Sequence, residues 1–304
     1  MCSKKTAVAL CLLLMVALSA AWFIGRPTYR RHKETRAVQQ AKEFIAKGDY
    51  RSASLSARQA LLANPHNLDA CRMMAELAEM AQSTNALEWL RRIAETAPTT
   101  ENKLRLAAAA LRFQPPPFPL TSNLLHEISA TASNLPTFHL LSAERALKLN
   151  HVTDALAHFQ CASRLEPSNE LHRLNLAVLN LTSTNPAIAT AARANLERLR
   201  SHTNLSAVAL RWLIAECLRQ GDRQTAQTHS EQLVADPRAL FDDHLQHLAI
   251  LHGLNSPNLQ TRLQLTQARA GTNAVELYKL SAWMISRSKA DAALHWIKSC
   301  PSQT

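Results

Sequence analysis

Apolar residues recur every three or four positions along most of the chain, and polar or charged residues fill the positions between them. This spacing places the apolar side chains on one face of an α-helix. The pattern therefore predicts an all-α protein. The clearest segments are Leu104–Phe113, Leu124–Ala132, Leu171–Leu181, Ile188–Leu199, Phe241–Leu251 and Leu259–Ala270.

One segment, residues 47–67, places small residues at regular intervals between a glycine and a proline, in the sequence KGDYRSASLSARQALLANPHN. Gly48 is expected to end one helix in a left-handed conformation. Ala53 and Ala60 would let the next helix pack closely against the first, and Pro65 would stop that helix. Tyr50 belongs to the same set of packing residues.

The arrangement recurs twice farther along the chain. The second copy consists of Ala155, Phe159, Ala162 and Pro167, and it has His151 at the place of the first glycine. A third copy includes Gly221 and Ala226. These residues together resemble the second half of the tetratricopeptide repeat (TPR), which runs from Gly-x-Tyr through spaced alanines to a proline. At about 34 residues per repeat, residues 33–300 accommodate about eight helix pairs. The resemblance implies a TPR-like α-solenoid, which is a right-handed superhelix of helix pairs.

An uncharged apolar run covers residues 6–24, and a cluster of basic residues follows it. As a helix this run would be about 28 Å long, close to the hydrocarbon thickness of a bilayer. The sequence therefore predicts one transmembrane helix, an uncleaved signal anchor, before the solenoid. A cleaved signal peptide is the alternative, because Ser19-Ala20-Ala21 resembles a cleavage site.

These features divide the chain into five predicted parts. A short basic N-terminus (1–5) precedes the anchor (6–24), and a basic juxtamembrane segment (25–36) follows it. The repeat domain covers residues 37–300, and a tail covers residues 301–304. More basic residues follow the apolar run than precede it, which favours a single-pass inner-membrane protein with a cytoplasmic repeat domain.

Composition argues against several classes of enzyme. The chain has only five glycines among 304 residues, so it lacks the glycine-rich loops that cradle phosphates or carry a nucleophilic serine. The net charge of +11 is concentrated near the N-terminus rather than along a nucleic-acid-binding face. We therefore expect no enzyme activity, no cofactor and no nucleic-acid partner.

One histidine-rich segment, FDDHLQHLAILHG, is the only candidate for metal chemistry in the sequence. On a helix, His244 and His247 share one face, and Asp243 lies four positions before His247. The glutamate of a His-Glu-x-x-His zinc site is missing. We expect a polar helix face without a metal, and a metal-dependent enzyme that uses His244 and His247 is the alternative.

The TPR resemblance also implies a ligand groove, because the first helix of each pair lines the concave face in that family. Carried over by position in the repeat, the groove positions hold Lys42, Cys71, Glu79, Glu144, Lys148, Arg211, Arg219 and His244. This set is more basic than acidic, which favours a protein or peptide partner with an acidic segment.

The leading prediction is a membrane-anchored TPR-type scaffold for protein–protein interactions, which helps to assemble an envelope-associated complex and contacts the membrane through residues 6–24. A secreted repeat protein, formed by signal cleavage, is a further alternative. The last helices, around Trp283, Met284 and Trp296, have no polar capping helix after them. We therefore expect apolar surface at this end and self-association through it.

Overall fold

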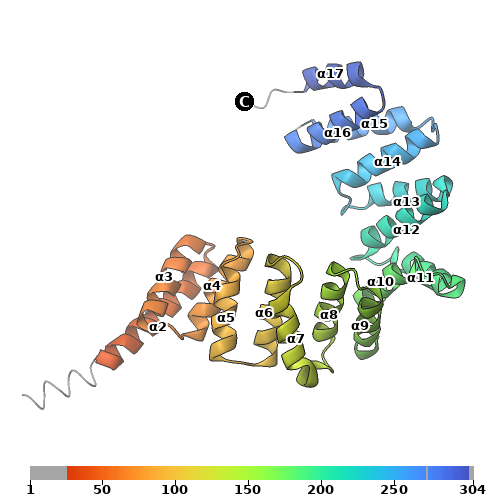
Figure 1. Ribbon diagram of the computed structural model, residues 1–304. Helices are drawn as coiled ribbons and strands as arrows, with labels where there is room; N and C mark the ends of the chain where they lie inside the picture. Colours follow the sequence, from red (N-terminus) through yellow and green to blue (C-terminus); the bar gives the residue numbers. More distant parts are fainter. Residues whose placement is uncertain (1–25, 272, 301–304) are drawn as a thin grey trace, which may run out of the picture. The chain divides into compact units, whose positions relative to one another are not determined.

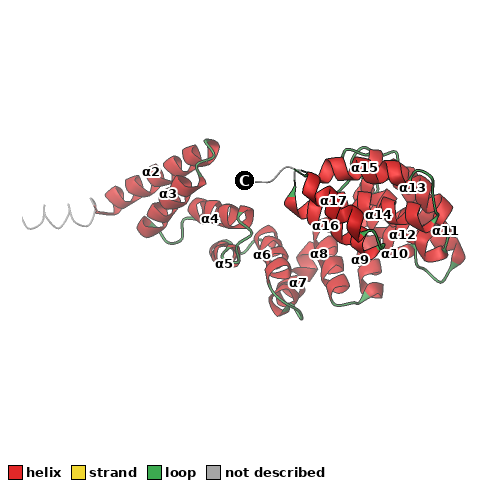
Figure 2. Cartoon of the chain, turned by 90° about the horizontal axis from the view of Figure 1, so that it is seen from above, coloured by secondary structure: helices red, strands yellow, loops and turns green. Residues whose placement is uncertain are grey.

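The computed structural model describes residues 26–271 and 273–300, and every element in this part of the chain is an α-helix (Figure 2). Sixteen helices, α2–α17, follow one another as eight pairs along these residues (Figure 1). We call the even-numbered helices the first helices and the odd-numbered helices the second helices of their pairs. The all-α architecture and the number of helix pairs agree with the sequence-based prediction.

The predicted transmembrane helix requires a correction. None of the described helices combines the length with the apolar character that crossing a bilayer demands. The longest of them, α2 (Arg26–Ala46), has 21 residues but contains many charged side chains. The predicted span at residues 6–24 lies outside the described residues. The fold class is therefore a helical-repeat fold without a membrane-spanning helix in its described part.

The chain divides into two compact units, and unit 1 extends to His158. One continuous apolar core runs through it from Ala37 to Leu141. Its helices are α2 (Arg26–Ala46), α3 (Tyr50–Ala63), α4 (Leu68–Met80), α5 (Ala86–Thr96), α6 (Thr100–Phe113), α7 (Pro119–Ala132), α8 (Pro136–Lys148) and the beginning of α9 (Val152–Leu165).

Unit 2 begins at Phe159, and its core consists of three smaller apolar clusters. The last cluster includes Met284, which is fully buried, while Trp283 and Trp296 pack against it half-buried. These three residues are therefore not themselves exposed. Apolar surface does occur at this end, because Ile285, Leu294 and Ile297 are 57%, 53% and 37% exposed. The remaining helices are α10 (Glu170–Asn180), α11 (Pro186–Leu199), α12 (Ser206–Gln220), α13 (Arg223–Ala235), α14 (Phe241–Gly253), α15 (Leu259–Ala270), α16 (Ala274–Ser286) and α17 (Ala290–Ser299).

A residue with positive φ marks the turn inside seven of the eight helix pairs. Six of these residues lie within two positions of the end of the first helix, where a left-handed conformation closes a helix, whereas Phe118 directly precedes α7. Glycine occupies this place only in the α2–α3 and α12–α13 turns. Asn150, rather than the neighbouring His151, occupies it between α8 and α9. The full set is Gly48, Gln82, Phe118, Asn150, Gly221, Asn255 and Ser288.

In both turns that contain glycine, an aspartate follows and caps the second helix. The Asp49 carboxylate accepts a hydrogen bond from the Ser52 backbone N–H at the start of α3. Asp222 does the same for Thr225 at the start of α13. Hydrogen bonding to the Ser52 and Thr225 side chains, and next to it these backbone bonds, holds the pKa of each carboxyl below its ordinary value, because hydrogen bonds to the carboxylate favour the charged form. The Gly-Asp pair thus closes one helix and begins the next.

Small side chains lie where the helices contact each other most closely. Alanine residues at these contacts are fully buried, which allows neighbouring helices to pack closely. The exposure of the predicted packing residues is 0% for Ala53, Ala60, Ala155, Ala162 and Ala226, and 6% for Phe159. Tyr50, in contrast, is 47% exposed at the first position of α3. Pro65 and Pro167 lie exposed just beyond the ends of α3 and α9.

Candidate functional site

The first helices of unit 1 follow one another along one face of their pairs, because each makes direct contact with the next. α2 and α4 are joined by an ion pair between Lys42 and Asp69, with Nζ and Oδ2 3.0 Å apart. α4 and α6 are joined by Glu79 and Arg105 at 3.3 Å. α6 and α8 pack directly on each other. We call this surface the first-helix face of unit 1.

A charged hollow lies between α2 and α4 on this face, with a volume of about 300 Å³. The Lys42–Asp69 ion pair crosses it, and Arg72 lies 3.8 Å from the same aspartate. These charges are exposed, so each pair contributes little to stability. The lining residues are Lys42, Ile45, Asp69, Arg72, Met73 and Glu76.

A second hollow, between α6 and α8, differs from the first because its walls are mainly apolar. Its volume is about 450 Å³, which is within the range of small-ligand sites. Arg105, which pairs with Glu79, and Glu101 are the charged residues among its walls. The lining residues are Glu101, Leu104, Arg105, Ala108, Leu135, Thr137 and Leu141.

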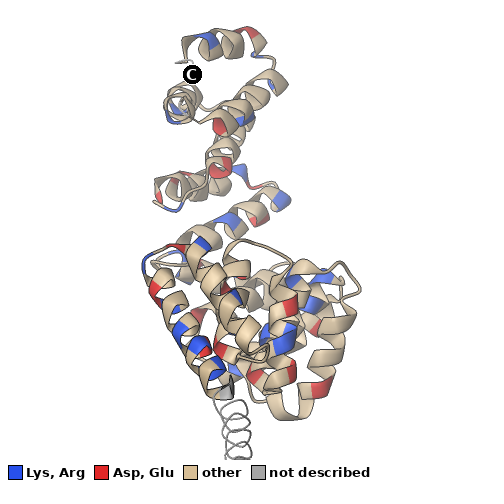
Figure 3. Ribbon diagram, turned by 90° about the vertical axis from the view of Figure 1, so that its left-hand side faces the viewer, with Lys and Arg blue, Asp and Glu red and all other residues tan. Residues whose placement is uncertain are grey.

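Ion pairs also join three first helices of unit 2, which are α12, α14 and α16. Arg211 of α12 binds both carboxylate oxygens of Asp243 on α14, at 2.9 Å and 2.8 Å. Asp242 on α14 binds Lys279 of α16 at 2.7 Å. Arg219 pairs within α12 with the buried Glu216. Figure 3 shows basic and acidic positions interspersed along the helices.

These pairings change the prediction of an acidic ligand for the groove positions. The basic residues Lys42, Arg211 and Arg219 each bind a carboxylate of the chain itself. An acidic segment would have to displace these internal partners. The predicted basic character of the groove is therefore largely neutralised within the protein.

Three of the other predicted groove positions in unit 1 also differ in what they present to a ligand. Cys71 is 2% exposed and lies inside the core, so it faces no groove. Burial raises the pKa of its thiol, because an apolar environment disfavours the thiolate. Glu144 and Lys148 are exposed on α8 and lie 4.0 Å apart one helical turn from each other.

The histidine-rich segment forms part of α14, where the Nε2 atoms of His244 and His247 are buried without a hydrogen-bond partner among the described residues. His247 is 2% exposed, and its Nδ1 lies 2.8 Å from the Ser230 hydroxyl. Burial lowers the pKa of His247 to about 4, and it also lowers the pKa of His244. Asp243, the third residue of the predicted set, binds Arg211 instead.

The described residues contain no group of three His, Cys, Asp or Glu side chains with the spacing of a metal site. His244 and His247 are thus two imidazoles without a third ligand in this part of the chain. A structural zinc ion is held by four protein ligands and a catalytic one by three. This arrangement does not support the alternative of a metal-dependent enzyme at α14.

Sequence analysis missed the walls of the apolar hollow. Leu104, Leu135 and Leu141 are ordinary core-type residues in the sequence. In the structure Leu141 is buried, whereas Leu104 and Leu135 are partly exposed beside the hollow between α6 and α8. No local pattern signals such a gap, because it depends on which side chains from neighbouring repeats fill the space.

Comparison with known protein families and with curated proteins finds no match. Solved structures share the fold. A tetratricopeptide repeat protein from Parabacteroides merdae is 12% identical over 88% of this chain and 100% of its own, with a TM-score of 0.63. Yeast Tom70 is 12% identical, over 84% of this chain and 57% of its own, with a TM-score of 0.57.

The Pseudomonas aeruginosa protein PilF is similar as well. It is 17% identical over 67% of this chain and 91% of its own, with a TM-score of 0.51. Together these likenesses show that the chain has the helical-repeat fold of tetratricopeptide proteins.

Proposed function

We propose that this protein is a scaffold that binds a partner protein by holding an extended peptide on the first-helix face of unit 1. The fold supports this proposal, because stacked helix pairs present long continuous surfaces that suit extended ligands. The observation that carries it is the apolar hollow between α6 and α8. An exposed apolar hollow of about 450 Å³ in an otherwise polar face is a place for an apolar side chain of a ligand.

The groups around the hollow define what kind of peptide fits. Leu104, Leu135 and Leu141 would surround a leucine- or phenylalanine-sized side chain. Arg105 and Glu101 lie among the same walls and offer a donor and an acceptor for the peptide backbone. Because Arg105 is already paired with Glu79, specificity would come from the apolar side chain rather than from ligand charge.

Selection from a displayed library of random twelve-residue peptides, with the full chain as bait, tests this proposal. The selected peptides should share one large apolar residue. Filling the hollow with Ala108→Phe should weaken their binding at least about tenfold, since a lost apolar contact of this size is worth more than about 1.4 kcal/mol.

Ala130→Phe is the matched control, because Ala130 is an exposed alanine on α7 that does not line the hollow. It should leave the affinity unchanged. Equal affinity of the wild type and the Ala108→Phe variant for every selected peptide would refute the proposal, and so would a selection that yields no peptide.

The finer parts of the predicted function remain proposals. These are a role in an envelope-associated complex and a location at the inner membrane with the repeats on the cytoplasmic side. Cross-linking in intact cells, followed by fractionation and identification of the cross-linked proteins, tests both. Recovery of the protein with cytosolic partners only would contradict them.

A further inference from the structure

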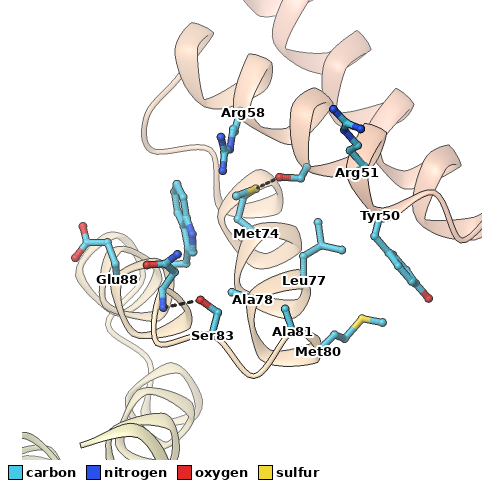
Figure 4. Close-up of a pocket in the computed structure, with 13 residues that line it drawn as sticks. Tyr50, Arg51, Arg58, Met74, Leu77, Ala78, Met80, Ala81, Ser83 and Glu88 are labelled. Atoms are coloured by element: carbon cyan, nitrogen blue, oxygen red, sulfur yellow. Dashed lines mark hydrogen bonds between the residues drawn. The ribbon is translucent and has the colours of Figure 1, made fainter.

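A further hollow of unit 1 lies between α4, which also belongs to the first-helix face, and the second helices α3 and α5. It has a volume of about 640 Å³ and is bounded by α3, α4, α5 and the turn between α4 and α5. Arg58 lies beside Met74 at one end of it, and Tyr50 lies near Leu77 and Met80 at the other (Figure 4). We call it the α3–α5 hollow.

The α3–α5 hollow combines apolar walls with exposed aromatic groups. Met74 is buried, whereas Met80 is 59% exposed and Tyr50 is 47% exposed. Trp89 is half-buried, and the Arg92 guanidinium lies 4.9 Å from the centre of its ring. Flexible methionines beside aromatic rings are characteristic of surfaces that adapt to apolar side chains of a partner.

Two guanidinium groups of this hollow lack an ionic partner within the described part of the chain. Arg51 and Arg58 both project from α3, and neither forms an ion pair with a described carboxylate. Glu88, the acidic residue of the same lining, is already bound by Arg92 at 3.0 Å and by Arg91 at 3.8 Å. The lining of the hollow therefore has an excess of positive charge, although Asp49, just outside the lining, interacts electrostatically with Arg51.

A neighbouring hollow of about 460 Å³ extends this surface along α5. The two hollows share Glu88 as a lining residue. Counted together, their walls contain four arginines but only two glutamates. The charged and titratable residues of the two hollows are Arg51, Arg58, His66, Glu88, Arg91, Arg92 and Glu95.

We propose that the α3–α5 hollow is a second docking site, which binds a protein segment with a carboxylate next to a large apolar side chain. The carboxylate would bind Arg51 or Arg58, because guanidinium–carboxylate hydrogen bonds are strong and bidentate. The apolar side chain would lie among Met74, Leu77 and Met80. An acidic partner fits this site better than the first-helix face, where Lys42 and Arg105 are already paired.

Two variants of the full chain test the charge requirement. The bait is challenged with a displayed library of random eight-residue peptides. Peptides that bind here should contain Asp or Glu beside Phe, Leu, Trp or Met. Their affinity should fall at least about tenfold in the Arg51→Gln/Arg58→Gln double variant. The Arg269→Gln/Arg287→Gln double variant of unit 2 removes the same charge and should leave the affinity unchanged.

Two further changes separate this site from the first-helix face and test its shape. Ala81→Trp, at the exposed end of α4, should fill the hollow and weaken binding without removing a charge. Ala108→Phe, which fills the hollow between α6 and α8, should have no effect on these peptides. The two variants thus distinguish a failure of the proposed site in the α3–α5 hollow from a failure of the proposed site between α6 and α8.

A charge reversal supplies the decisive comparison. The Arg51→Glu/Arg58→Glu variant, challenged with the same library, should select basic peptides in place of acidic ones. The proposal is overturned if acidic peptides bind the wild type and the Gln double variant equally, or if the library yields no acidic binder. It is also overturned if a single-stranded DNA oligonucleotide competes as well as the peptides do, since that result indicates a general polyanion surface.

Discussion

Replacing Asp243 by alanine is expected to destabilise unit 2 much more than replacing its neighbour Asp242. Asp243 is 5% exposed, and its carboxylate accepts three hydrogen bonds. Two come from Arg211 on α12, at 2.9 Å and 2.8 Å, and the third comes from the Leu240 backbone N–H at 2.7 Å. The side chain therefore joins two repeats and also caps the start of α14.

The magnitude follows from what the substitution leaves unpaired. Removing one partner of a buried ion pair costs about 3–5 kcal/mol, but the Arg211 side chain is 29% exposed, so water recovers part of this loss. The lost cap adds about 1 kcal/mol. We expect a total near 3 kcal/mol. Asp242 and Lys279 are 63% and 40% exposed, and loss of such a surface pair costs less than about 1 kcal/mol.

Urea unfolding of the full chain, followed by far-UV circular dichroism and by tryptophan fluorescence, measures both effects. Trp212 of α12 lies next to Arg211 in the sequence and reports on this part of unit 2. Asp242→Ala is the matched control, because it removes the same charge from the same helix. Equal losses of stability for the two variants would refute the reasoning that burial decides the cost.

Two other predictions concern a histidine and two glycines. Burial lowers the pKa of His247 to about 4, so on acidification this imidazole is protonated in the unfolded state before it is protonated in the folded state. The free energy of unfolding should therefore fall as the pH drops from about 6.5 to 4, and the contribution of His247 to this fall is about 3 kcal/mol. The urea midpoint should fall less across this pH range in His247→Gln than in the wild type. An equal pH dependence of the midpoint in the two proteins would contradict this prediction. Gly221→Ala should cost about 1 kcal/mol because φ is +82° there, whereas Gly271→Ala, at φ −60°, should stay within about 0.5 kcal/mol. Thermal melts compare the two, and equal shifts would argue against strain at Gly221.

Helix positions could be predicted from the sequence because they depend on local periodicity. The expected segment Ile188–Leu199 lies within α11 (Pro186–Leu199), and Leu259–Ala270 coincides with α15. The turns were harder to predict. Glycine signals only two of the seven positive-φ positions, and residues as different as Phe118 and Ser288 occupy others, because tertiary packing can hold a non-glycine residue in this conformation.

The candidate site could be predicted only in outline. Placing the groove positions on first helices was within reach, since it needs only the order of the helices. The ionic partner of each charged residue could not be predicted, because it depends on how far one helix is shifted along the next. The ion pairs between first helices are separated by 27 residues for Lys42–Asp69 but by 37 for Asp242–Lys279. No fixed period in the sequence predicts such pairs.

The ion pairs between consecutive first helices limit how freely the repeats can be rearranged. α4 carries Asp69 for Lys42 of the repeat before it and Glu79 for Arg105 of the repeat after it. α14 instead presents two aspartates, one to Arg211 before it and one to Lys279 after it. The repeats that contain α4 and α14 are thus each matched in charge to both of their neighbours. Moving either of these two repeats to another place in the chain would leave some of these charges facing the wrong partner, and the cost would be largest at the partly buried Arg211–Asp243 pair.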